Sequence, residues 1–379
     1  MATHTPNPVI VGWSVLSPLG TGRREFADRL RRGGRPRRRF PALDLTELVG
    51  GKGTRVLDRM TLMVIATTDM VLREYAGDLG DTVGSVGLVL GTSTGSVAST
   101  TAFVRDTFVQ ERPYFVNPTL FPNTVMNGAA GHTAIWHGLR GLNSTISSGH
   151  LTGLATLRYA SRMIRSGYAE TLLVGCVEEL SEPVAVAAGR LRRVDGRAGG
   201  RAPGEGCAVF LVAAAGSRLA TGRSPLAELL DFEFRLYPST GPAGPGGHRG
   251  QADELAAAIR ELLRRNGLTA ADLWSVGVGH GGVDDLGTAE REAVDRALGG
   301  PDGPARYAIA AQIGDCYSAG GAFQLAALLA SAESQSGAAG RLTLLTSLGT
   351  DGAVAAALVR TWATAGAPAT PARREYAAR

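Results

Sequence analysis

Few side chains in this 379-residue chain have the chemistry of a nucleophile or base, because it holds three cysteines, six histidines and one lysine, Lys52. Ser147 and Ser148 closely precede His150, and serine and histidine are the residue types of a catalytic serine–histidine relay. Neighbouring residues of a strand-to-turn segment point apart, so we expect no such relay there. Cys316 adjoins Asp315 and has the type of a displaced nucleophile, but we expect a small buried thiol.

The other two cysteines, Cys176 and Cys207, end and begin apolar segments, and we interpret both as packing residues. The spacing of the three cysteines fits neither a metal site nor a disulfide framework. We therefore expect a reducing, cytoplasmic compartment, no bound metal and no cofactor. His132 and His137 are assigned to a structural helix end and its loop.

The segments that must position these residues alternate between short apolar strands and helices. Strands are expected at residues 9–16, 86–90, 143–147 and 171–175, and helices at 58–75, 121–136 and 152–166. This alternation predicts parallel strands with crossover helices, hence an α/β fold.

The same order of elements begins again near residue 226. The second series comprises strands at 226–234, 275–278, 307–311, 342–346 and 354–359, with helices at 251–266 and 287–298. The chain therefore reads as two duplicated halves, 1–215 and 216–365, followed by a flexible tail at 366–379.

Composition excludes several classes of protein. The net charge is +5, from 39 basic and 34 acidic residues, and no DNA-binding motif accompanies the arginines, so nucleic acid is not an expected partner. No apolar run reaches the roughly 18 residues that a membrane span requires, and the N-terminus lacks the pattern of a signal peptide. The arginines considered for nucleic-acid binding form one cluster near the N-terminus: Arg31, Arg32, Arg35, Arg37, Arg38 and Arg39.

Five motifs, in this order and spacing, resemble the β-ketoacyl synthases of fatty acid and polyketide assembly over residues 9–360. They are Val9-Ile10-Val11-Gly12 with Ser17-Pro18-Leu19-Gly20, Ala130-Gly131-His132 with Gly138-Leu139-Arg140-Gly141, Ser166-Gly167-Tyr168-Ala169-Glu170, Pro203-Gly204-Glu205-Gly206, and Ser318-Ala319-Gly320-Gly321-Ala322. The resemblance implies the thiolase-like αβαβα arrangement of five layers.

The resemblance also implies a catalytic cysteine at a helix start, two histidines and a lysine. Matching the motifs puts His150 at the cysteine, His280 at the first histidine, Asp315 at the second histidine and Ala310 at the lysine. An imidazole cannot replace a thiolate that holds an acyl chain as a thioester. The glycine loop beside the site also departs from the family pattern, reading Ser347-Leu348-Gly349-Thr350-Asp351-Gly352.

The resemblance further implies that residues 120–128 form a helix that reaches towards a partner's acyl pocket. Phe121, Thr124 and Gly128 would share one helical face, and the small Gly128 would leave room for a long chain. The predicted substrate-channel residues are Leu120, Phe121, Thr124, Val125 and Gly128. Ordinary packing at a subunit interface is the alternative.

Losses at four positions are the pattern of chain-length-factor subunits of type II polyketide synthases, which pair with a competent ketosynthase acting on chains tethered to acyl carrier protein. We therefore expect a catalytically degenerate subunit with those two partners. One alternative is an unusual acyltransferase or malonyl decarboxylase that uses His150 and His280. Another is a purely structural homodimer.

Overall fold

A computed structural model describes residues 6–33, 40, 43–194, 202–238, 248–280, 285–334 and 339–362. The tail at 366–379, predicted to be flexible, lies outside the described residues, as do Arg35, Arg37, Arg38 and Arg39. Arg31 and Arg32 end a helix. Among the described residues, no helix combines the length and apolar character needed to cross a membrane.

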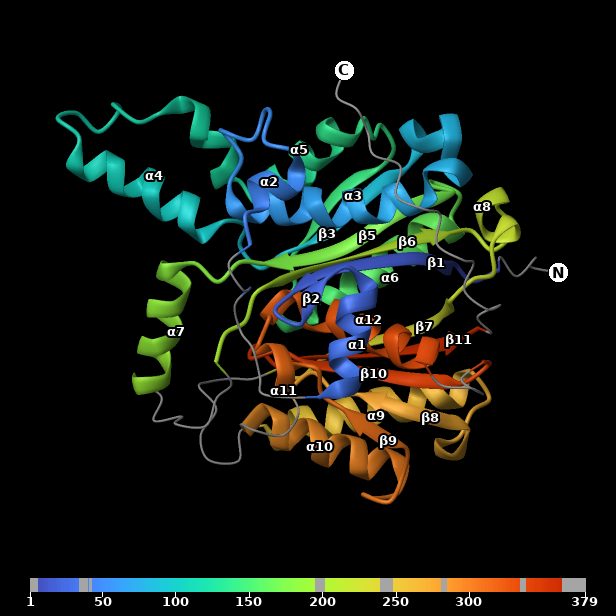
Figure 1. The fold of residues 1–379 in the computed structure, drawn as a ribbon. Coiled ribbons are helices and arrows are strands. Elements are labelled where there is room, and N and C mark those ends of the chain that lie inside the picture. The colour runs from blue at the N-terminus through green and yellow to red at the C-terminus, as the bar shows by residue number, and fades with distance from the viewer. Residues whose placement is uncertain are drawn as a thin grey trace.

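One hydrogen-bonded sheet of 11 strands forms two layers of the same topology, which we call the first and the second sheet (Figure 1). The first has the order β4-β3-β5-β6-β1, and the second has the order β9-β8-β10-β11-β7. The first comprises β1 (Val9–Ser17), β3 (Gly87–Gly91), β4 (Asn143–Ile146), β5 (Thr171–Glu178) and β6 (Gly206–Ala213), and β2 (Gly20–Thr21) pairs with β1. The second comprises β7 (Ala227–Leu236), β8 (Leu273–Gly277), β9 (Ala305–Tyr307), β10 (Leu342–Leu348) and β11 (Ala353–Thr361).

The matching strand order confirms the duplication predicted from the sequence. The expectation of parallel strands holds only for one side of each sheet, because β3 is parallel to β4 and β5, whereas β6 is antiparallel to β5 and β1. A strand buried on both faces is apolar throughout, so its sequence does not reveal its direction. β1 also pairs with β7 at Val9–Glu228 and Ile10–Ala227, which joins the two sheets.

Helices fill three layers around the sheets, which confirms the five-layered arrangement (Figure 1). The outer layers contain α3 (Arg59–Leu79) and α5 (Gly128–His137) on the first sheet, and α9 (Arg249–Arg265) and α10 (Asp285–Leu298) on the second. The central layer contains α6 (Thr152–Arg165) and α12 (Gly320–Ser334), with α1 (Arg23–Arg32) beside α12. The remaining helices are α2 (Leu45–Val49), α4 (Val97–Val109), α7 (Glu182–Val194), α8 (Arg218–Gly222) and α11 (Ala310–Ile313), and the 3-10 turns are η1 (Gly80–Ser85), η2 (Pro118–Thr124), η3 (Gly149–Leu151), η4 (Ala270–Asp272) and η5 (Tyr317–Ala319).

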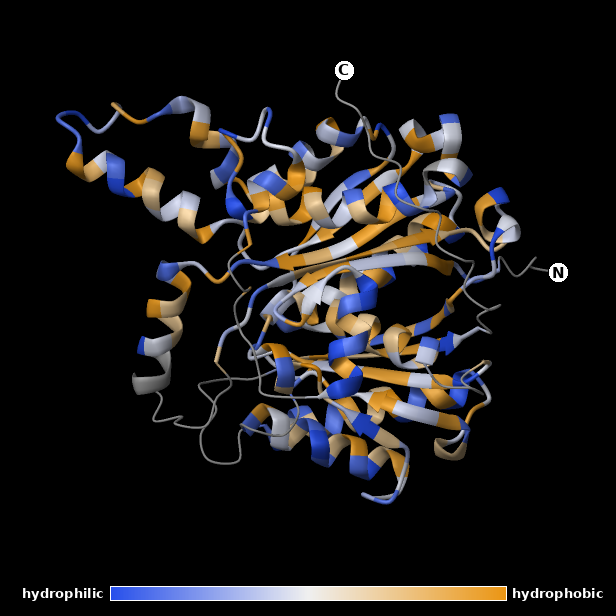
Figure 2. Cartoon of the chain, in the orientation of Figure 1, coloured by the Kyte–Doolittle hydropathy of each residue, from blue (hydrophilic) through white to orange (hydrophobic). Residues whose placement is uncertain are grey.

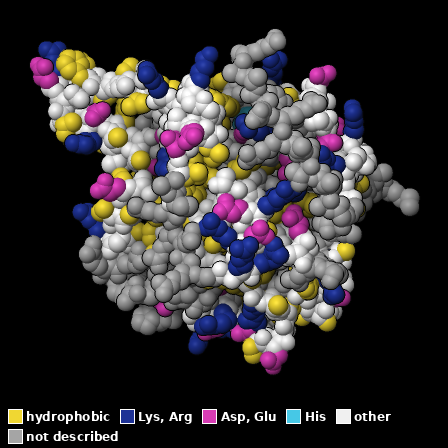
Figure 3. Space-filling view, viewed as in Figure 1, with side chains coloured by type: hydrophobic (Ala, Val, Ile, Leu, Met, Phe, Trp, Pro, Cys, Tyr) yellow, Lys and Arg dark blue, Asp and Glu magenta, His cyan; other side chains and the backbone are white. Residues whose placement is uncertain are grey.

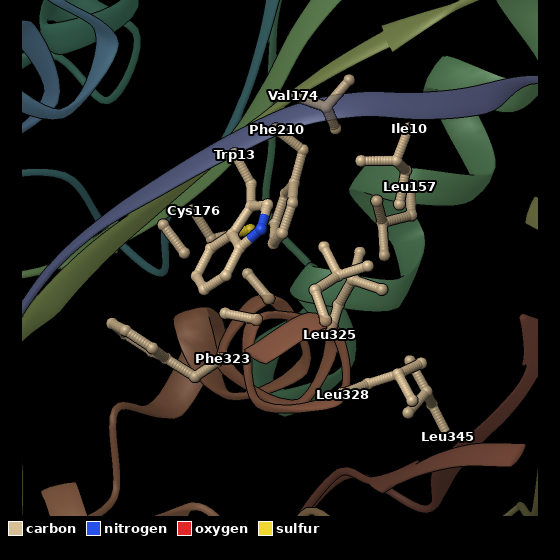
Figure 4. Close-up of a cluster of buried hydrophobic side chains, with 14 of the residues drawn as sticks. Ile10, Trp13, Leu157, Val174, Cys176, Phe210, Phe323, Leu325, Leu328 and Leu345 are labelled. Atoms are coloured by element: carbon tan, nitrogen blue, oxygen red, sulfur yellow. The ribbon is translucent and has the colours of Figure 1, made fainter. Parts of the chain in front are cut away.

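The central hydrophobic core lies between the sheets. Trp13 and Phe210 extend from the first sheet towards Phe323 and Leu325 of α12, and Leu345 of β10 approaches from the other side (Figure 4). Apolar strands line this core from both sheets (Figure 2). α12 packs between the two sheets, and burial of its apolar side chains holds the helix in place. Its N-terminal end lies at the site described next.

The prediction of one continuous helix over residues 121–136 was wrong. The chain instead forms η2, an irregular stretch at residues 125–127, and then α5. Pro122 lies inside η2 and has no amide hydrogen to donate to an α-helix. Phe121, Thr124 and Gly128 therefore do not share the face of one helix. A Cβ atom on Gly128 would lie 2.3 Å from the Pro122 carbonyl oxygen, so this glycine permits a close backbone approach.

Candidate functional site

Two buried helices begin at the same place between the sheets. α6 and α12 approach so closely that a Cβ atom on Gly153 would lie 2.7 Å from the Ala322 backbone nitrogen and from the Gly321 Cα atom. The 3-10 turns that precede the helices carry His150 and Tyr317. The close crossing therefore positions both side chains at the helix N-termini, where backbone N–H groups create positive potential.

The four site positions predicted from the sequence border one cavity at this point. The His150 and His280 ring centroids are 4.7 Å apart, and the His150 and Tyr317 ring centroids are 4.2 Å apart. Nε2 of His150 lies 3.5 Å from Oδ2 of Asp315. Ala310, at the start of α11, lines the same cavity.

An imidazole–carboxylate pair thus occupies the place where the family resemblance implies a thiol and a second imidazole. Burial works to raise the pKa of the Asp315 carboxyl, but the hydrogen bond and charge of His150, with the charge of His280, outweigh burial and lower the pKa to about 2. Asp315 is therefore a carboxylate at neutral pH. It cannot donate a proton to a thioester carbonyl, which is what a second histidine would do.

Glu290 and two strand ends hold His280 in place. Oε1 and Oε2 of Glu290 accept the backbone amides of Gly279 and His280 at 2.9 and 2.8 Å, and Thr346 donates to Oε1 at 2.7 Å. His280 Nε2 lies 2.9 Å from the Leu348 carbonyl oxygen. Since a carbonyl only accepts, Nε2 carries a proton in this contact and is not available there as a base.

The cavity is small and partly polar. Its volume is about 20 Å³, which is room for about one water molecule. Gln324, 1% exposed, donates to the Thr346 carbonyl at 2.9 Å, while its Oε1 atom has no hydrogen-bond partner. Nδ1 of His150 is also buried and without a partner. The space is too small for an acyl thioester.

None of the three cysteines provides a thiolate at the site. Cys316 is 2% exposed and lines the cavity, but burial and then the negative charge of Asp315, Glu178 and Glu205 raise the pKa of its thiol well above the usual value. Burial raises the pKa of Cys176 and of Cys207 to about 12. Each thiol therefore stays protonated, and a protonated thiol is a poor nucleophile.

Ser147 does not form the serine–histidine relay, because its Oγ donates to the Ser93 carbonyl at 2.7 Å. The backbone amide of Ser148 donates to Thr152 Oγ1 at 2.8 Å. His137 ends α5 and lies 3.3 Å from the Ile65 carbonyl oxygen, which gives it a packing role.

The predicted substrate-channel residues lie away from this cavity. None of Leu120, Phe121, Thr124, Val125 and Gly128 lines it. The first four belong to a projecting segment, residues 97–127, which we call the arm and which is formed by α4, η2 and their connections (Figure 1). Leu120 is 39% exposed and Phe121 is 54% exposed.

Glu178 is a site neighbour that the sequence did not reveal. Its Oε1 atom accepts hydrogen bonds from the Ser93 amide, at 2.7 Å, and from the Ser318 hydroxyl. Burial raises the pKa of Glu178 to about 7 from an ordinary value of 4.5, although the hydrogen bonds lower it. The only sequence signal was its place at the end of an apolar strand.

Replacing Glu178 with glutamine is expected to stabilise the protein in a pH-dependent way. Because the folded-state pKa is the higher one, the stability contributed by protonated Glu178 is lost as pH rises from 4.5 through about 7. Glutamine keeps the acceptor oxygen without the charge, so the free energy of unfolding should rise by roughly 1–3 kcal/mol at pH 8 and little at pH 5. Urea denaturation at both pH values measures this, with exposed Glu182→Gln as the control. An equal change at both pH values would contradict the assignment.

Residues 44–216 match the family model "Beta-ketoacyl synthase, N-terminal domain". The chain is 29% identical over 277 residues to 3-oxoacyl-[acyl-carrier-protein] synthase 2 of Vibrio harveyi, which covers 68% of this chain and 64% of that protein. It is 29% identical over 216 residues to the actinorhodin polyketide putative beta-ketoacyl synthase 2 of Streptomyces coelicolor, which covers 53% of this chain and 51% of that one. The chain thus spans under two thirds of the length of these relatives.

A solved structure extends the match to nearly the whole chain. The ishigamide ketosynthase/chain length factor superposes with a TM-score of 0.80 at 32% identity, covering 94% of this chain and all of that chain. The fold, the strand order of both halves and the sequence identity agree. The chain therefore belongs to the β-ketoacyl synthase family.

Proposed function

We propose that this chain is a chain-length-factor-type subunit of a type II polyketide synthase, which pairs in the cytoplasm with a competent ketosynthase and does not itself form the acyl thioester. The observation that carries the proposal is the site. His150 lies where the nucleophile is expected, with Asp315 and Ala310 beside it, around a cavity of about 20 Å³.

The chemistry of condensation identifies what is missing. Decarboxylating a malonyl thioester requires a group that polarises the thioester carbonyl and stabilises the enolate. Here the second such position is the carboxylate of Asp315, whose negative charge opposes an enolate. His280 can donate, but it donates to the Leu348 carbonyl. The same observations weigh against an acyltransferase or decarboxylase built on His150 and His280.

The arm supplies a surface for the partner. None of the thirteen residues of α4 is buried, although the helix includes Phe103, Val104 and Phe108. Phe108 is 82% exposed and Phe115 is 49% exposed. Apolar side chains gather on this projection in the space-filling view (Figure 3). An exposed apolar surface of this kind indicates a protein interface, and the ishigamide relative is named for both subunit types.

Strand β4, which follows the arm in the sequence, forms the edge of the first sheet and offers a second surface for contact with the partner. Within the described part of the chain, β4 pairs only with β3, so its outer edge is open to another strand. We propose that β4 and the arm meet the ketosynthase together. Leu120, Phe121, Thr124 and Val125 would then form the wall of the chain tunnel at that interface. Gly128 would act as a backbone contact.

Negative charge introduced on the arm should weaken the complex between this chain and the ketosynthase. In the double variant Phe108→Asp with Phe115→Asp, two carboxylates would be buried against apolar surface, so affinity for the co-expressed ketosynthase should fall at least about thirtyfold. Co-purification and analytical ultracentrifugation measure it. Leu236→Asp is the matched control, because Leu236 is 64% exposed but lies at the end of β7 in the second sheet. Unchanged assembly of the double variant would overturn the proposed interface.

A further inference from the structure

Tyr317 has an unusual backbone conformation at the cavity. Its φ angle of 43° makes it the one non-glycine residue with positive φ among the described residues. A side chain is disfavoured in this region because its Cβ atom crowds the carbonyl oxygen that follows. Such a conformation persists only where surrounding contacts impose it, and residues of this kind cluster at functional sites.

Contacts with Asp315, His150 and Gly149 hold Tyr317 in this conformation. Its backbone amide donates to Oδ1 of Asp315 at 2.8 Å. Its ring meets the His150 ring edge to face, with an interplanar angle of 71°. Its hydroxyl lies above Gly149, 3.5 Å from where a Cβ atom on that glycine would be. The strained turn therefore directs the ring onto the imidazole.

Tyr317 lies at the boundary between the cavity and solvent. Tyr317 lines the cavity, and yet it is 37% exposed, so one side of the residue faces inward and the other faces outward. Nδ1 of His150, whose ring the Tyr317 ring contacts, is buried and has no hydrogen-bond partner. Whenever His150 is neutral with its proton on Nε2, which faces Asp315, Nδ1 holds a lone pair and is a nucleophile towards activated acyl groups.

We infer that Tyr317 is a plug that shields His150 from acyl thioesters. The inference rests on the proposed function, because it explains how a non-catalytic subunit avoids destroying its partner's substrates. Without the ring, the imidazole would attack a thioester carbonyl, the C–S bond would break, and the thiol would leave with a proton. Water would then cleave the N–C bond of the acyl-imidazole and release a carboxylic acid. The plug thus prevents hydrolysis of chains meant for elongation.

Two variants of Tyr317 separate the ring from the backbone. Tyr317→Gly removes the ring and suits positive φ, so the turn is kept. Tyr317→Phe keeps the ring as the matched control. Diethyl pyrocarbonate, which forms an N-carbethoxy bond to imidazole and releases carbon dioxide and ethanol, is the probe. Peptide mass spectrometry follows His150 in each variant, with partly exposed His132 as the internal reference.

Tyr317→Gly should raise the rate of His150 modification at least about tenfold relative to His132, whereas Tyr317→Phe should match the wild type. Tyr317→Gly should also hydrolyse a small acetyl thioester, and the added change His150→Ala should abolish that activity. Equal His150 modification in wild type and Tyr317→Gly, with unchanged thermal melting, would overturn the plug. Acylation of wild-type His150 by a malonyl thioester would contradict the proposed function together with the plug, whereas equal modification contradicts the plug alone, so the two failures are distinguishable.

Discussion

Replacing Gly153 with alanine is expected to lower the free energy of unfolding by about 3 kcal/mol, the upper end of what overpacking a dense core costs. The new methyl carbon would lie 2.7 Å from backbone atoms of Gly321 and Ala322. Backbone cannot rotate away as a flexible side chain can. α12 would have to shift, and that helix buries ten of its fifteen residues between the two sheets.

A matched glycine isolates this effect from the general preference of helices for alanine. Gly131, inside α5, has no atom beyond its own stretch of helix within 4 Å of its Cβ position. Gly131→Ala should therefore raise the free energy of unfolding by up to about 1 kcal/mol, because alanine favours the helix. Urea denaturation of both variants at one pH gives the comparison. Similar values for the two variants would show that α6 and α12 do not meet at Gly153 as described.

The order of elements was readable from the sequence because strands and helices here have clear periods. The predicted strand at 342–346 and helix at 152–166 match β10 and α6 to within two residues. Both segments are bounded by residues that end regular structure, so local signals agree with the fold. The prediction that His150 lies at a helix start was possible because the beginning of this helix was readable from the sequence.

Features that depend on tertiary contacts were not readable. The run at 121–136 has apolar residues at helical spacing, but Pro122 and the approach of Gly128 to the Pro122 carbonyl interrupt it. The positive φ of Tyr317 has no signature in the sequence, since it depends on tertiary contacts such as the packing of its ring onto His150. The raised pKa of Glu178 likewise follows from burial.

In the proposed pair with a ketosynthase, an asymmetry between the two subunits is the second large effect that we expect. In the pair reconstituted with ketosynthase and acyl carrier protein, changing the ketosynthase's nucleophilic cysteine to alanine should lower polyketide formation at least about a thousandfold, because no thioester can form. His150→Ala in this chain should leave the rate within about twofold, because the imidazole makes no bond to the growing chain. Size-exclusion chromatography must show an intact pair in both cases.

The rate of polyketide formation by the intact His150→Ala pair is therefore the most direct test. A rate within about twofold of wild type, with the acyl adduct found by intact mass spectrometry on the ketosynthase alone, is the predicted result. Loss of product with the pair still assembled, or an acyl adduct on this chain, would contradict a non-catalytic subunit and favour an enzyme built on His150 and His280.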